Sequence, residues 1–125
     1  MKTRRTQSGM FVIEALISVV LIAIGLVGLM IMAAQAANQA GQSKFRNDAS
    51  YLAGELIGEM WTSSAAPSGF STTNWQTRVA GLIPGGTGTV TVTGTQVAID
   101  ISWPDHKEGN SVRHHYRTTA QIEKN

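Results

Sequence analysis

A single carboxylate stands inside the most apolar stretch of this chain of 125 residues. Residues 10–34 are apolar or small apart from Glu14 and Ser18, and no other side chain in the stretch is ionisable. A carboxylate within a membrane span costs on the order of 2 to 3 kcal/mol on insertion scales, and less near an edge of the span. Glu14 therefore needs a cationic partner that the stretch does not provide.

Such a partner arises if the chain is cut after Gly9. The new α-amino group of Met10 is then a cation about one helical turn from Glu14, at a depth where it can pair with the carboxylate of a neighbouring copy. If that cut occurs, these residues can form an ion pair between neighbouring copies of the chain.

The stretch around Glu14 is long enough to cross a membrane, since a helix over 10–34 at about 1.5 Å per residue spans a hydrocarbon core of about 30 Å. Lys2, Arg4 and Arg5 precede the stretch, and the next basic residue is Lys44. The positive-inside rule therefore places the N-terminus in the cytoplasm and the rest of the chain outside.

Two simpler interpretations of the N-terminus stay open. A secretory signal peptide also combines a basic start, an apolar run and small residues at the cut, for which Ala34-Gln35-Ala36 is a candidate. Against it, the run exceeds the usual length of about 7 to 15 residues and contains a carboxylate. The other interpretation is a plain single-pass anchor, which leaves Glu14 unexplained.

Charge and cysteine content exclude several functions. Removing Lys2, Arg4 and Arg5 from the ten Lys and Arg leaves seven, against eight Asp and Glu, so the chain beyond residue 9 is nearly neutral. Such a chain gives no basic face for phosphates, so we expect no nucleic acid binding. The absence of cysteine excludes disulfides, thiolate nucleophiles and cysteine-based metal sites.

The histidines raise a metal hypothesis that their spacing disfavours. The candidate ligands are His106, His114 and His115, with Asp105 and Glu108 nearby. His114 and His115 are adjacent in a stretch with strand periodicity, so their side chains point to opposite faces. Nor does any nucleophile elbow bring Ser, His and Asp together. We therefore expect no metal site, no cofactor and no enzyme activity.

Beyond the membrane the helix becomes amphipathic. Residues 35–61 carry apolar side chains at helical spacing, with most charged residues on other faces. We predict one helix from Met10 to Trp61, about 78 Å long, whose outer half packs on a head domain. The apolar stripe comprises Phe45, Ala49, Leu52, Leu56 and Met60, flanked by Ala53 and Ile57.

A short second helix is predicted after a loop rich in Ser, Thr, Ala and Gly at 62–73. Asn74 is its expected N-cap, and Trp75, Val79 and Leu82 face one way before Pro84-Gly85-Gly86 ends it. Three tryptophans, Trp61, Trp75 and Trp103, are expected to fill a small core rather than form an exposed binding patch for sugars or peptides.

Three runs with period-two alternation then predict three strands. Gly94-Thr95 is short enough for a hairpin, and 104–110 forms a longer polar turn. The inward positions are Val90 and Val92; Val97, Ile99, Ile101 and Trp103; and Val112, His114, Tyr116, Thr118, Ala120 and Ile122. The predicted fold class is α+β, a long N-terminal helix packed on a small three-stranded antiparallel sheet.

The first residues of the chain resemble a type IV prepilin: Lys-Thr-Arg-Arg-Thr-Gln-Ser-Gly9 followed by Met10-Phe-Val-Ile-Glu14-Ala-Leu-Ile-Ser18. The resemblance implies that residues 1–9 are a leader, that prepilin peptidase cuts between Gly9 and Met10, and that Met10 is then N-methylated. It also implies that Glu14 is the acidic fifth residue that sets a subunit's register. Met10 stands where Phe is commonest in this family.

Two later segments look like PilV-type minor pilins. They are Trp75–Gly86 with the following strands to Trp103, and the helix segment Ala49–Met60. The disulfide loop of many pilins has no counterpart here, because there is no cysteine. The resemblance implies a leader (1–9), a membrane and assembly half of the helix (10–34), an amphipathic half (35–61) and a periplasmic head (62–125).

The implied function is that of a minor pilin, held in the inner membrane by one span and then incorporated through its N-terminal helix into a type IV pilus, where it supports assembly or initiation. Its implied partners are other major and minor pilins, the prepilin peptidase, the inner-membrane assembly machinery and the membrane. Two alternatives stay open: a minor pseudopilin of type II secretion, which the Trp75–Gly86 segment disfavours, and a membrane-tethered periplasmic binding module.

Overall fold

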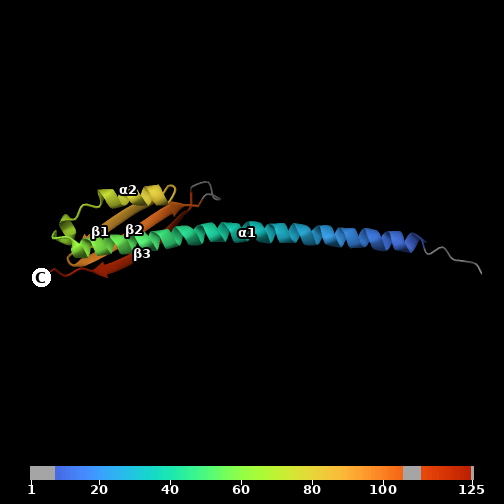
Figure 1. Ribbon diagram of the computed structural model, residues 1–125, viewed down its shortest axis with the longest axis horizontal. Helices are drawn as coiled ribbons and strands as arrows, with labels where there is room; N and C mark the ends of the chain where they lie inside the picture. Colours follow the sequence, from blue (N-terminus) through green and yellow to red (C-terminus); the bar gives the residue numbers. More distant parts are fainter. Residues whose placement is uncertain (1–7, 106–110, 125) are drawn as a thin grey trace, which may run out of the picture. The chain divides into compact units, whose positions relative to one another are not determined.

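The computed structural model describes residues 8–105 and 111–124. Its elements are α1 (Ser8–Thr62), the 3-10 turn η1 (Pro67–Gly69), α2 (Thr73–Leu82), β1 (Thr87–Thr93), β2 (Gln96–Pro104) and β3 (Arg113–Gln121), as drawn in Figure 1. The chain divides into two compact units, Met1–Gly41 and Gln42–Asn125, and α1 contributes to both. The predicted α+β class is confirmed.

The first unit consists, where described, of the N-terminal part of α1. Every residue from 9 to 40 is exposed, including the large apolar ones. The helix is long and apolar enough to cross a membrane. The predicted single helix from Met10 to Trp61 is confirmed, with bounds of Ser8 and Thr62.

The second unit, the head, contains the predicted antiparallel sheet in the order β1-β2-β3. Pairing of Thr93 with Gln96 leaves Gly94-Thr95 as the predicted hairpin turn, and Gly94 has a φ of 62°, which glycine adopts readily. Pro104, predicted to begin the next turn, instead ends β2 opposite Arg113. The rest of that predicted turn, 106–110, lies outside the described residues.

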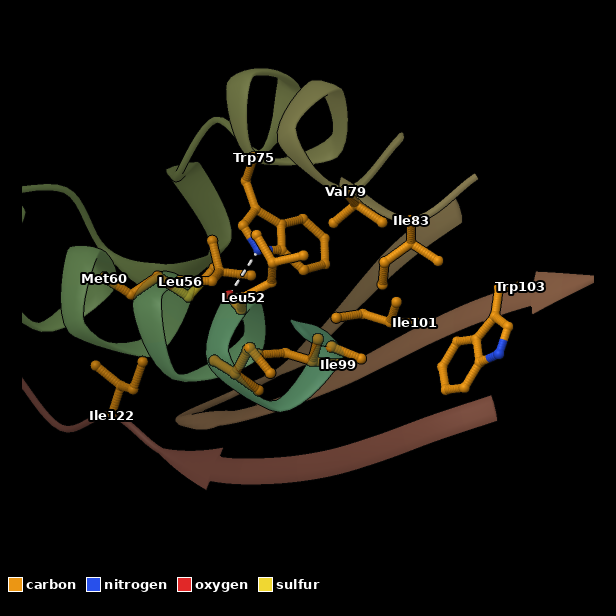
Figure 2. Packing of buried hydrophobic residues seen from close by; sticks show 13 residues of the cluster. Leu52, Leu56, Met60, Trp75, Val79, Ile83, Ile99, Ile101, Trp103 and Ile122 are labelled. Atoms are coloured by element: carbon orange, nitrogen blue, oxygen red, sulfur yellow. Dashed lines mark hydrogen bonds between the residues drawn. The ribbon is translucent and has the colours of Figure 1, made fainter. Parts of the chain in front are cut away.

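The core of the head lies between one face of the sheet and the helices α1 and α2 (Figure 2). The predicted helical stripe is confirmed, because its central members are buried and Phe45 and Ile57 pack at its margin. Inward residues of β2 are fully buried because β2 is the central strand. The buried set is Ala49, Leu52, Ala53, Leu56, Met60, Trp75, Val79, Ile83, Val97, Ile99, Ile101, Trp103 and Ile122.

Three of the side-chain predictions for the head were wrong. Trp61 is 51% exposed, since it follows the last buried position of α1 and points away from the core. Leu82 is exposed, and Ile83 is buried in its place because the backbone becomes extended there. Val112 precedes β3 and is 45% exposed.

The expected cap of the second helix was also wrong. The helix begins at Thr73, so Asn74 lies within its first turn, and the N-cap position falls on Thr72. Thr72 makes no side-chain capping hydrogen bond. The orientation of α2 is fixed instead by the burial of Trp75 and Val79.

Candidate functional site

Gly9 and Met10 lie in the first turn of α1, both exposed. Met10 is 79% exposed, and a Cβ built on Gly9 meets nothing within 4 Å. The first four N–H groups of a helix have no intrahelical partner, so opening this turn breaks few hydrogen bonds. Within the described residues, the peptide bond between Gly9 and Met10 is thus exposed and lies in a turn that can open locally.

Glu14 follows on the same exposed helix. Its backbone carbonyl accepts a hydrogen bond from the Ser18 hydroxyl at 2.8 Å. Its carboxylate has no hydrogen bond or ion pair with any residue of 8–105 or 111–124. Lys2, Arg4 and Arg5 lie outside the described residues. Within the described chain, Glu14 is thus an isolated carboxylate on an apolar surface.

Two residues of α2, Trp75 and Arg78, make polar contacts with α1 in the described part of the head. The indole Nε1 of Trp75 donates to the carbonyl oxygen of Leu52 at 2.8 Å, as the dashed line in Figure 2 shows. Arg78 Nη2 lies 2.7 Å from Glu59 Oε1 and 3.4 Å from Glu55 Oε1. These contacts hold the short helix over the core, and none of them offers a reactive group.

Sequence reasoning missed these ion pairs. Arg78 and Glu59 are 19 positions apart, and their pairing depends on how α2 folds back on α1. No local spacing rule connects such residues. The burial of Trp75 was the one available signal, because it fixes which face of α2 meets α1.

An acidic residue on the uncovered face of the sheet contacts two basic side chains. Asp100 accepts hydrogen bonds from His115 Nδ1 at 3.0 Å and from Arg117 Nε at 2.9 Å. Partial burial acts to raise the pKa of Asp100, but the hydrogen bonds and charges of His115 and Arg117 outweigh it and hold this pKa below its ordinary value. The carboxylate links β2 to β3.

We expect this interaction to be lost in acid. Because the folded-state pKa of Asp100 is lowered, its contribution to stability is fully present above the unfolded-state value of about 3.9 and disappears as the pH falls below it. Replacing Asp100 with Asn should therefore lower Tm at neutral pH, and the difference from wild type should shrink below about pH 4. Thermal unfolding across pH checks this, and a constant difference at every pH would contradict it.

The histidines on β3 do not converge. His114 is half-buried and lies 3.1 Å from Asp105, whereas His115 is exposed on the other face beside Asp100. The expectation that they point to opposite faces is confirmed. Among residues 8–105 and 111–124, no three His, Asp or Glu side chains come together as metal ligands. His106 and Glu108 lie outside the described residues.

Comparisons with protein-family profiles, with curated proteins and with solved structures found no match to this chain. The candidate site therefore rests on the N-terminal residues themselves. It consists of Gly9, Met10 and Glu14 on the exposed apolar part of α1.

Proposed function

We propose that this chain is a minor pilin that is cut after Gly9 and enters a type IV pilus through the N-terminal part of α1. The observation that carries the proposal is the position of Glu14, a carboxylate without a partner in the described chain, five residues after Gly9 on an exposed apolar helix. A cut after Gly9 gives Met10 an α-amino group, which is the cation that Glu14 of a neighbouring copy requires.

The exposed apolar surface of α1 supports two successive environments for the chain. From Met10 to Met32 the helix presents large apolar side chains that are each at least half exposed. Lipid covers such a surface while the helix lies in a membrane. Once the helix leaves the membrane, another apolar surface must take the place of the lipid. The same helix of neighbouring subunits provides such a surface.

An exposed face of α1 within the head supports packing between subunits as well. Tyr51 and Trp61 are 69% and 51% exposed and lie on one helical face with Gly54 and Gly58. A Cβ on either glycine meets nothing within 4 Å, so the head itself does not require glycine there. Glycines one turn apart allow a neighbouring helix to approach closely.

The proposal predicts the mature N-terminus. Mass spectrometry of the protein purified from its native host should find an N-methylated Met10 as the first residue. Replacing Gly9 with Val should block the cut, because a branched side chain then occupies the position before it, while Ser8→Ala should leave the cut intact. An intact Met1, or a terminus just after Ala36, would overturn the proposal.

A deletion strain separates this role from the alternatives. Loss of surface pili with normal exoprotein secretion is expected for a minor pilin. The reverse result would assign the chain to a type II secretion pseudopilus. Restoration of pili by the head alone, without residues 1–36, would instead indicate a tethered binding module.

A further inference from the structure

A small pocket opens in the head beside the part of α1 that begins the second unit. Its volume is ≈ 170 Å³. Ligand sites for larger molecules are typically about 300 to 1,000 Å³, so this pocket holds only a small chemical group. Its lining comes from α1, β2 and β3: Gln42, Ser43, Arg46, Trp103, His114 and His115.

The α1 side of the pocket presents hydrogen-bond donors. Trp103 Nε1, which can only donate, bonds Gln42 Oε1 at 3.0 Å, and this fixes the amide so that its NH2 group stays available. The Ser43 hydroxyl and the Arg46 guanidinium bond no residue of the described chain. Three donor groups, one of them permanently charged, therefore line one wall.

Among the described residues, the strand side of the pocket includes a histidine and no carboxylate. His114 lines it, and His115, the next residue along β3, also borders it although its imidazole lies on the other face beside Asp100. Asp105, which His114 contacts, is not among the described lining residues. Asp100 is further neutralised by Arg117 at 2.9 Å. Trp103 is buried and stacks at a tilt on His114, with ring centroids 6.0 Å apart, so it gives the pocket a rigid wall.

We propose that this pocket binds a small oxyanion, a carboxylate or a phosphate. Arg46 forms the ion pair, and Gln42 and Ser43 donate neutral hydrogen bonds. No carboxylate of residues 8–105 or 111–124 lines the pocket, so the described lining does not repel an anion. The proposal goes beyond filament assembly and does not depend on it, since it needs neither the cut at Gly9 nor a neighbouring subunit.

The test uses the full chain in detergent micelles, titrated with sodium acetate or sodium phosphate while chloride keeps the ionic strength constant. NMR follows the Trp103 indole N–H and the amides of residues 42–46. We expect a saturable shift with a Kd on the order of 1 to 10 mM. The arm that saturates identifies the anion as carboxylate or phosphate, and saturation in both arms assigns the pocket to oxyanions in general.

Two matched variants make the result specific. Arg46→Gln should weaken binding about tenfold or more, because it removes a charge-assisted hydrogen bond. Lys44→Gln is the control, since Lys44 is exposed, pairs with Asp48 at 3.0 Å and does not line the pocket, and its Kd should stay within about twofold of wild type. Shifts that do not saturate, or equal loss in the two variants, would overturn the proposal.

Discussion

Replacing Glu14 with Ala is expected to reduce incorporation of the chain into pili about tenfold or more, while the protein still inserts into the membrane. Under the proposed function, the lost interaction is the ion pair between Glu14 and the Met10 amine of a neighbour, which would form in an apolar environment where water does not screen it. A factor of ten needs only about 1.4 kcal/mol. Insertion should continue, because the change removes a charge from the span.

Two further variants separate charge from polarity in this experiment. Glu14→Gln keeps the size of the side chain and removes its charge, so it should behave like Glu14→Ala. Ser18→Ala removes a hydroxyl one turn further along, which within the described residues bonds the carbonyl of Glu14 alone, and should leave incorporation unchanged. Immunoblots of sheared pili measure incorporation, and immunoblots of membrane fractions measure insertion. Normal incorporation of Glu14→Gln would contradict the ion-pair mechanism.

Periodicity in the sequence predicted the helices and strands of this fold well, because each spacing of apolar residues fits one type of secondary structure. The stripe from Phe45 to Met60 has helical spacing and becomes the buried face of α1. Val97 to Trp103 alternates with period two and becomes the central strand. Gly94-Thr95 is too short for anything but a tight turn, and it joins β1 to β2.

The failures lie where an element ends. Trp61 and Leu82 are the last or nearly last residues of their helices, and the helical pattern does not say which of two adjacent apolar residues turns inward there. At the end of α2 the backbone becomes extended and buries Ile83 instead. Tertiary packing determines which residue is buried at such helix ends, and the spacing of apolar residues in the sequence does not predict it.

The N-terminal site and the pocket in the head also differ in how far the sequence predicts them. Gly9, Met10 and Glu14 are close in sequence and stand out against an apolar background, so the sequence alone predicts their chemistry. The pocket is different, because Gln42 and Trp103 are 61 positions apart and meet only when α1 lies on the sheet. In the sequence, its hydrogen-bond donors cannot be told apart from other polar surface residues, because only the fold brings them together.

The largest effect on stability is expected from Trp75. Replacing it with Ala should lower the free energy of unfolding of the head by about 3 to 5 kcal/mol, the usual range for removing a buried aromatic side chain. Trp75 is 1% exposed, lies at the centre of the core in Figure 2, and donates the hydrogen bond to Leu52. Denaturant unfolding of the full chain in detergent measures the loss.

Trp61→Ala is the matched control, because the same side chain is 51% exposed there and its removal should cost far less. A second test of the Trp75 contact uses Gly88, where an added Cβ would lie 2.5 Å from the Trp75 ring. Gly88→Ala should therefore be destabilising in the wild-type chain and much less so when Trp75 is already Ala. An equal cost in both backgrounds would show that the indole does not fill the space that Gly88 leaves, and the packing of α2 against β1 would need another explanation.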